Sequence, residues 1–395
     1  MNLQRLNGND KKIVNHTPLK IRFDWQIIAP PIVIVLANIY LIWPLLTNFP
    51  ATIDWRRLIF PLAYIFGPVG LYFYVWEISR RRLTSLLAAL IYTLPAIRLT
   101  EAINFGDQAH VIALSILPLS LICFLRYLRN PTLVLITITA FSMAAIAIIS
   151  PLTLFTLLIF IMTITYSEML LGQGRFKLIL ALIVLILAAG LSAFWYHPEF
   201  LIDLFKSDRG RALISIIWDL FPLSFVILPV IGAFTFLIFD RRPLWQPIFL
   251  AGSQSFVFLL IYWVGNNISS LYVPEPAHFL PELIFTLSFF LAQIITTLFK
   301  VLTLDFIRQK IKIPDRQFLL IINQVLPGLV LILFTVLIIM ARTNYWDLIG
   351  GEWAAPIIYR HYGGISTIVG RAISLFTIVI LGIIWFNYRI KRQNV

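Results

Sequence analysis

The stretch Thr100-Glu-Ala-Ile-Asn-Phe-Gly-Asp-Gln-Ala-His110 is a short polar island between two apolar runs, residues 83–97 and 111–128. Such runs recur along the whole chain, and many reach the roughly 17–25 residues with which a helix crosses a bilayer. Backbone groups in lipid must be bonded within their own segment, and the runs do not alternate as barrel strands do, so helical spans are predicted. The island is therefore either a plain connection between two membrane helices or the mouth of a site.

The composition indicates the same class of protein. Hydrophobic residues make up 60% of the chain and charged residues 12%, against roughly 45–50% and about 25% in soluble domains. We predict an all-α, polytopic transmembrane helical bundle of about twelve spans. The predicted spans are residues 25–46, 58–78, 83–98, 110–128, 131–149, 151–166, 177–197, 222–239, 247–264, 282–302, 318–340 and 372–388.

The distribution of Lys and Arg predicts the orientation. With the N-terminus inside, 22 of the 31 basic residues fall on inner segments and 9 on outer ones, in keeping with the positive-inside rule. This bias accounts for the net charge of +13 without nucleic acid as a partner. It also requires residues 131–166 to cross twice, with a break at Ser150-Pro151, because Arg129 and Arg175 must both lie inside.

The predicted domain organisation follows from this topology. Residues 1–24 form a cytoplasmic N-terminal segment, residues 25–388 the transmembrane domain and residues 389–395 a cytoplasmic tail. No cleavable signal peptide is expected, because no small-residue cleavage site follows the first apolar run. The predicted outer loops are short and cover residues 47–57, 99–109, 198–221, 265–281 and 341–371.

Histidines and acidic residues gather on the predicted outer face. Four of the five histidines and eleven of the eighteen acidic residues lie there. Polar residues other than Lys and Arg tolerate the outside, but the gathering of histidines has no topological reason. Ionisable groups near a membrane mark functional sites. We therefore expect the reactive or binding face to be exterior.

Within the island, Asp107-Gln-Ala-His110 opens the predicted fourth span. Asp107 is placed to cap that helix, and it lies three residues from His110, so that the two side chains share a face. A carboxylate beside an imidazole makes a general base or half of a metal site. A cap beside an interfacial histidine is the structural alternative. Glu101 has no capping role, which makes it the better catalytic candidate.

The stretch Ala193-Phe-Trp-Tyr-His-Pro-Glu-Phe200 supplies His197 and Glu199 as candidate binding residues. Proline is favoured at the first position of a helix, so Pro198 is predicted to start a new one. Apolar and acidic positions then fall on opposite faces, which predicts a helix lying on the outer surface of the membrane.

Two later outer stretches supply further candidates. Arg209 and Arg211 suit bidentate binding of a phosphate, although a solvated loop beside lipid head groups explains them equally. Residues 346–362 include Trp353 and Arg360 among aromatic and acidic side chains. That mixture suits sugars, and it also suits a membrane interface.

Several stretches resemble the membrane-embedded glycosyltransferases of the GT-C fold, in particular uncharacterised bacterial members. The resemblance covers most of residues 25–300. It implies transfer of a sugar from a polyprenyl-phosphate donor to a glycan, lipid or protein acceptor, at the outer face of a bacterial plasma membrane and in cell-envelope polysaccharide synthesis. The stretches are Gly67-Pro-Val-Gly-Leu-Tyr-Phe-Tyr74 with Arg80-Arg-Arg82, Asn104-Phe-Gly-Asp-Gln-Ala-His110, Ile149-Ser-Pro-Leu-Thr153 and Leu191-Ser-Ala-Phe-Trp-Tyr-His-Pro-Glu199.

The resemblance also implies residue roles. In that family a carboxylate of the first outer loop acts as base or metal ligand, and Asp54 is the only acid in that loop here. Glu101 and Asp107 match a second acidic site before the fourth helix, with His110 as a supporting group. A divalent cation, Mg²⁺ or Mn²⁺, is the candidate cofactor, and its ligands are left open.

A non-enzymatic carrier or flippase for lipid-linked saccharide is the alternative, and a membrane scaffold is a third. A carrier needs a polar path across the membrane, for which the spans offer only scattered polar residues. The sequence holds no phosphate-binding loop, dinucleotide fingerprint or His-Glu-x-x-His motif. The mid-span polar residues are Gln254, Gln293, Asn323 and Gln324.

Overall fold

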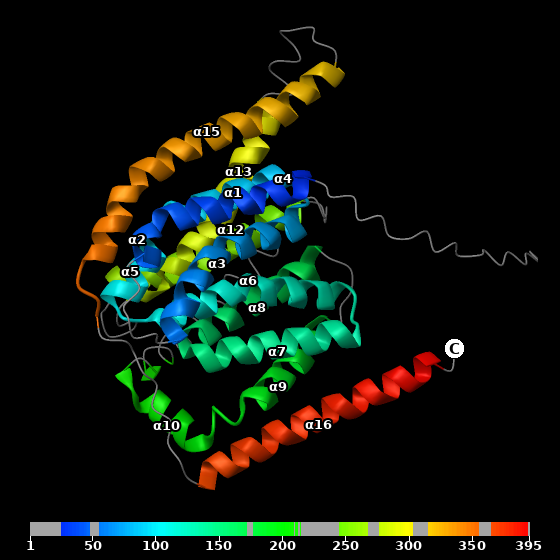
Figure 1. Ribbon diagram of the computed structural model, residues 1–395. Helices are drawn as coiled ribbons and strands as arrows, with labels where there is room; N and C mark the ends of the chain where they lie inside the picture. The colour runs from blue at the N-terminus through cyan, green and yellow to red at the C-terminus, as the bar shows by residue number, and fades with distance from the viewer. Residues whose placement is uncertain are drawn as a thin grey trace, which may run out of the picture.

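The chain folds into a bundle of helices, seen in a computed structural model (Figure 1). Eight helices in the described residues are long and apolar enough to cross a membrane, and three shorter apolar helices accompany them. The protein is therefore an all-α integral membrane protein. Twelve spans remain a prediction, because the predicted span 222–239 lies outside the described residues. The structure describes residues 25–47, 55–171, 177–208, 210–211, 214, 245–267, 276–302, 315–354 and 365–393.

The helix boundaries follow local breakers and caps. A break at residues 94–96 separates α4 from α5, and the two together form one of the eight candidate spans. Ser150 separates α7 from α8, which confirms the predicted break. In order, the elements are α1 (Trp25–Leu41), α2 (Trp43–Thr47), α3 (Trp55–Ser79), α4 (Arg82–Thr93), α5 (Ile97–Asn104), α6 (Gln108–Arg129), α7 (Leu133–Ile149), α8 (Pro151–Leu171), α9 (Lys177–Ser192), α10 (Pro198–Lys206), α12 (Gln246–Asn267), η2 (Pro276–Phe279), α13 (Leu280–Leu302), α15 (Asp315–Gly350) and α16 (Ile365–Gln393).

Helices extend into the predicted outer loops. Helix α5 covers residues 97–104 and so includes the first part of the island, and α15 continues to Gly350, ten residues beyond its predicted end at residue 340. Hydropathy marks where a helix leaves lipid, whereas a helix itself ends only where a breaker or cap stops it. No glycine or proline stands between Met340 and Gly350, so the helix continues through polar residues.

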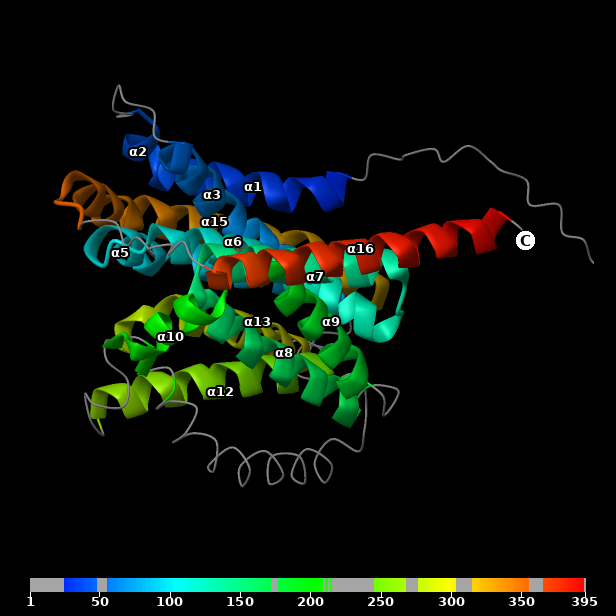
Figure 2. The same ribbon diagram turned by 90° about the horizontal axis from the view of Figure 1, so that it is seen from below.

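The centre of the bundle is formed by α3 and α6, with α4, α7, α8, α12 and α13 around them (Figures 1 and 2). Close contact between α3 and α6 depends on Gly70, where an added Cβ would lie 3.1 Å from the Pro118 ring. The core is rich in aromatic side chains, which bury a large apolar area each. Several of them, including Tyr72, Tyr74 and Phe285, are fully buried.

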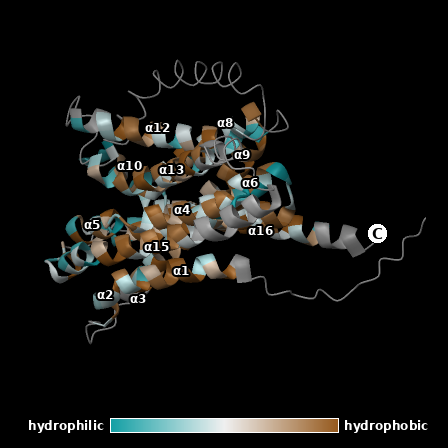
Figure 3. Ribbon diagram, turned by 90° about the horizontal axis from the view of Figure 1, so that it is seen from above, coloured by the Kyte–Doolittle hydropathy of each residue, from teal (hydrophilic) through white to brown (hydrophobic). Residues whose placement is uncertain are grey.

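The helices α15 and α16 lie at the periphery of the bundle (Figure 1). Apolar side chains such as Ile332 on α15 and Phe376 on α16 are exposed. Figure 3 shows α15 as largely hydrophobic, while hydrophilic residues gather around α5. Exposed apolar surface of this kind suits lipid, since acyl chains are as apolar as the side chains themselves.

The alternation of helices defines two ends of the bundle. The α5 end comprises α5, α10, the end of α15 and the start of α16 (Figure 1). The arginine end comprises the turns at residues 80–81 and 130–132, the end of α8 and the start of α9. The start of α1 and the end of α16 also lie there. This grouping has the arrangement expected for the predicted outer and inner faces.

Candidate functional site

The polar island folds inward at the α5 end. After α5, Gly106 adopts a φ of 68°, a conformation that favours glycine. Asp107 then caps α6, because its Oδ1 accepts a hydrogen bond from the backbone N–H of His110 at 3.0 Å. The predicted capping role is thus confirmed. Glu101, Asp107 and His110 are all buried, so the island is more than an exposed connection.

Two histidine–carboxylate pairs join the island to the start of α13. The His278 Nδ1 contacts the Glu101 carboxylate. The Nε2 of His110 lies 3.3 Å from Glu282 Oε1. Each segment thus supplies one histidine and one acid, and each histidine faces the acid of the other segment. We call these four residues the crossed pairs. All four are buried, which strengthens their electrostatic interactions.

The two pairs differ in their geometry. Glu101 and His278 are within hydrogen-bonding distance, and Phe105 packs on the His278 ring with centroids 4.6 Å apart. In the second pair, Glu282 Oε1 is close enough to His110 Nε2 for an ion pair, but the contact does not have the geometry of a hydrogen bond. The other side of the His110 ring is held at Nδ1, which lies 2.8 Å from Thr153 Oγ1 at the start of α8. His110 is therefore positioned by three segments.

The chemistry available to this arrangement is proton transfer. A carboxylate that holds one nitrogen of a histidine fixes the orientation of the ring and stabilises its protonated form. The Glu101–His278 pair has this arrangement.

The remaining predicted site residues lie elsewhere. His197 is buried at the start of α10 and lies 3.1 Å from Ser366 of α16. Glu199 is exposed on α10. Arg211 is also exposed, and its Nη2 is 3.7 Å from Asp208 Oδ1. Trp353 packs edge-on against Phe60 of α3. Asp54, Arg209 and Arg360 lie outside the described residues.

Sequence reasoning missed the partners of the island. His278 and Glu282 are one helical turn apart, and both belong to stretches of ionisable residues at the predicted outer face. That spacing indicates a shared face, but it does not indicate which distant residues they meet. In the described ranges, no group of three or more His, Cys, Asp or Glu residues is arranged to hold a metal ion. The predicted Mg²⁺ or Mn²⁺ therefore stays a prediction.

A second ionic cluster lies at the arginine end. The Glu168 carboxylate contacts Lys177 Nζ at 2.6 Å and Arg129 Nη2 at 2.9 Å. Gln246 donates its amide N–H to the same carboxylate at 2.6 Å. These residues come from α6, α8, α9 and α12. We call them the Glu168 network, and it ties four helices together.

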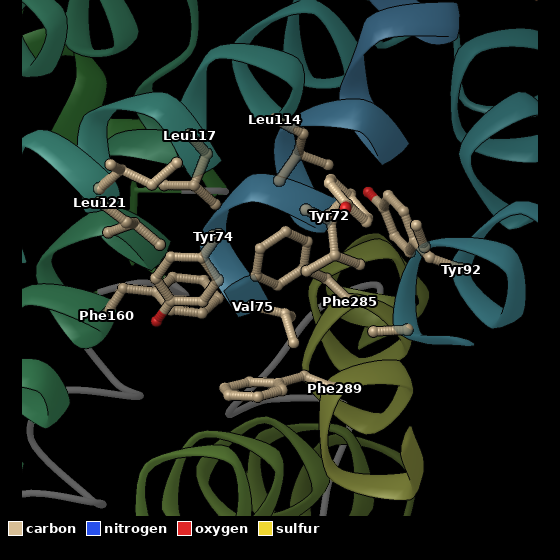
Figure 4. Close-up of a cluster of buried hydrophobic side chains, with 14 of the residues drawn as sticks. Tyr72, Tyr74, Val75, Tyr92, Leu114, Leu117, Leu121, Phe160, Phe285 and Phe289 are labelled. Carbon is tan, nitrogen blue, oxygen red and sulfur yellow. The ribbon is translucent and has the colours of Figure 1, made fainter. Parts of the chain in front are cut away.

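Aromatic side chains lie between the two ends. Along α13, Phe285 and Phe289 are buried between Glu282 and Gln293, together with the hydroxyl side chains of Thr286 and Ser288. Phe285 contacts rings from α3, α4 and α8. Figure 4 shows these rings in one cluster with Leu114, Leu117 and Leu121. We call it the aromatic layer. It comprises Tyr72, Tyr74, Tyr92, Phe160, Phe285 and Phe289.

No protein-family model, curated protein or solved structure matches the chain. The resemblance to the GT-C glycosyltransferases therefore rests on the sequence stretches alone.

Proposed function

We propose that this protein is a membrane glycosyltransferase. It transfers a sugar from a polyprenyl-phosphate-linked donor to a hydroxyl of a glycan, lipid or protein acceptor, at the outer face of a bacterial plasma membrane. The observation that carries this proposal is the pairing of His278 with the buried Glu101 at the predicted outer end. Such transfer needs a base for the acceptor and an interface where a lipid donor and a polar acceptor meet.

In the proposed reaction, His278 is the base and Glu101 orients it. The acceptor hydroxyl gives its proton to Nε2 of His278, and its oxygen bonds to C1 of the sugar. The bond between C1 and the phosphate oxygen breaks, and its electron pair stays on the phosphate. Glu101, bonded at Nδ1, stabilises the imidazolium that forms. The proton then passes to water as the product leaves.

The second crossed pair has a positioning role. Glu282 lies in the first turn of α13, one turn after His278, and His110 is held by Thr153. This pair therefore fixes α13 against α6 and α8. The Glu101–His278 geometry depends on that placement, because His278 stands at the start of the same helical segment.

The aromatic layer favours a site at one side of the membrane over a carrier, because a carrier needs a polar path across the membrane. Gln254, one of the mid-span polar residues, is fully buried, and its amide nitrogen lies 3.2 Å from Tyr74 Oη and 3.3 Å from Thr163 Oγ1. It is thus part of a packed hydrogen-bond network. Gln293 is also buried. Between it and Glu282 lie Phe285 and Phe289, and the hydroxyls of Thr286 and Ser288 in the same interval donate to backbone carbonyls of α13. The side chains of Asn323 and Gln324 lie outside the described residues.

The proposal is tested with protein in nanodiscs and a panel of polyprenyl-phosphate donors carrying labelled sugars. Release of label from the lipid, with and without acceptor, is the measurement. Glu101→Gln and His278→Asn are expected to lower the rate by about 10²–10⁴-fold, the range that general-base catalysis contributes. The control is Glu352→Gln, because Glu352 is an exposed carboxylate beyond α15.

Two results would count against the proposal. Wild-type rates in both variants would remove the assigned base. Movement of intact donor across proteoliposomes by the wild-type protein, without cleavage, would support the carrier instead.

A further inference from the structure

Arg98 is a buried cation one turn before Glu101. Its side chain is only 2% exposed. The guanidinium carbon lies 4.0 Å from the centroid of the Tyr64 ring and 4.5 Å from that of Tyr92. Aromatic faces attract a cation, but they supply no negative charge.

The niche for this guanidinium is built into α3. Pro68 has no N–H, so the carbonyl of Tyr64, four residues earlier, has no donor within its own helix. Arg98 Nη1 donates to that carbonyl at 3.0 Å. Gly67 makes room, because a Cβ there would lie 3.0 Å from Arg98 Nη1. The Gly67-Pro68 pair thus provides both the space and the acceptor.

The rest of the guanidinium is unsatisfied. In the described part of the chain, neither Nε nor Nη2 of Arg98 has a hydrogen-bond partner, and no carboxylate pairs with it. A buried charge without a counter-charge is strongly unfavourable. Nε and Nη2 form one edge of the guanidinium, and this edge matches the two oxygens of a phosphate or carboxylate.

We propose that the Nε–Nη2 edge of Arg98 binds a phosphate group. The bilayer supplies it, because Arg98 lies within the candidate span Arg82–Asn104 among apolar and aromatic side chains. The inference rests on the proposed function only for the identity of the ligand, which would be the polyprenyl-phosphate donor. Arg98 and Glu101 share one face of α5, so a phosphate there lies about one helical turn from Glu101, the residue that orients the proposed base His278.

The cover over this niche is α15. Tyr345 on α15 accepts a hydrogen bond from the Tyr64 hydroxyl at 3.0 Å, and its own hydroxyl lies 2.6 Å from the carbonyl oxygen of Thr93. Only 17% of the apolar window of α15 is buried, the smallest share among the eight candidate spans. In the proposed binding, the phosphate reaches Arg98 from the membrane when α15 moves towards lipid and Tyr345, which is fully buried here, leaves its hydrogen bonds.

The test compares ligand-induced thermal stabilisation of the protein in nanodiscs. The ligands are a polyprenyl monophosphate, the uncharged polyprenol and inorganic phosphate. We expect the polyprenyl monophosphate to raise the midpoint of unfolding and the polyprenol to leave it unchanged. Equal affinity for inorganic phosphate would keep the phosphate site and exclude the lipid as its source. No stabilisation of the wild-type protein by either phosphate would overturn the proposal.

The variant that tests the contact is Arg98→Lys. Lysine keeps the positive charge but lacks the paired N–H donors of the Nε–Nη2 edge. The affinity for the polyprenyl monophosphate should therefore fall by about tenfold or more. The matched control is Arg342→Lys. Arg342 also stacks on an aromatic ring, that of Trp346 at 4.0 Å, but it is only half-buried and donates to Tyr40.

The outcomes separate this proposal from the proposed function. Binding that is lost in Arg98→Lys, with no sugar transfer by the wild type, would keep the phosphate site and count against the transferase. Unchanged binding in Arg98→Lys would overturn the Arg98 site whatever the transfer assay shows. The ligand-binding measurements on the wild-type protein test the phosphate site even if a variant fails to fold.

Discussion

Both ends of the bundle bury carboxylates, but they pair them with different partners. At the arginine end, Glu168 contacts the basic side chains of Lys177 and Arg129. At the α5 end, Glu101 and Glu282 face histidines, a residue type that acts as general acid or base in proteins. A fixed ion pair holds helices together, whereas a histidine–carboxylate pair can also move a proton. Under the proposed function, the arginine end supplies structural support and the α5 end supplies the chemistry.

The same contrast appears in a second pair at the arginine end. Glu77 contacts Arg80 and Arg126, both at 2.7 Å. Those arginine side chains are more than half exposed, so water and salt screen them. Lys177, by contrast, is buried with Glu168. The Glu168 network should accordingly dominate the stability of this end.

The largest expected effect is that of Glu168→Ala. It leaves Lys177 buried without its counter-charge, so the free energy of unfolding should fall by about 3–5 kcal/mol. Unfolding of the detergent-solubilised protein measures this loss. Glu77→Ala is the control, with an expected loss of about 1 kcal/mol or less, because its partners reach water. Similar losses in the two variants would contradict the distinction between buried and exposed pairs.

An intermediate effect is expected from Gly370→Ala, which tests attachment of α16 at the α5 end by packing rather than by charge. A Cβ at Gly370 would overlap the carbonyl oxygen of Ala193, and such overpacking costs about 1–3 kcal/mol. Gly382→Ala on the same helix is the matched control, since nothing lies within 4 Å of its added Cβ. Thermal unfolding of the two variants side by side measures the difference, and equal midpoints would disprove the close contact.

The smallest expected effect on stability is that of Glu101→Gln. The amide keeps the size of the carboxylate and can still accept a hydrogen bond from a neutral His278, so the expected loss is about 1 kcal/mol. The same variant is expected to lose most of the transferase activity. A loss of stability as large as that of Glu168→Ala, measured in the same unfolding assay, would place the crossed pairs with the structural ion pairs.

Sequence reasoning succeeded where the signal is local. The capping role of Asp107 and the break at Ser150-Pro151 follow from residue chemistry within a few positions, and both are confirmed. It was less successful at element ends, because α5 and the end of α15 continue as helix into stretches predicted to be loop. Hydropathy falls where the chain leaves lipid, but a helix continues until a breaker stops it.

The candidate site was predicted in part. Glu101, Asp107 and His110 were selected as one group, and the structure buries all three between α5 and the start of α6, with His278 and Glu282 as partners of Glu101 and His110. His197, Glu199 and Trp353 were selected because they lie on the predicted outer face, and because of the residue types around them. They lie on α10 or beyond α15, because sidedness sets only the depth of a residue in the membrane and not its neighbours around the bundle.

The sequence by itself determined that this is a helical membrane protein, since apolar run length and the need to satisfy backbone hydrogen bonds in lipid leave no other fold. Only the tertiary structure decided that Glu101 meets His278, 177 residues later in the chain. It also decided that Arg98 occupies the niche made by Gly67 and Pro68. Both contacts depend on which helices pack together, and that is fixed by side-chain shape across the whole core.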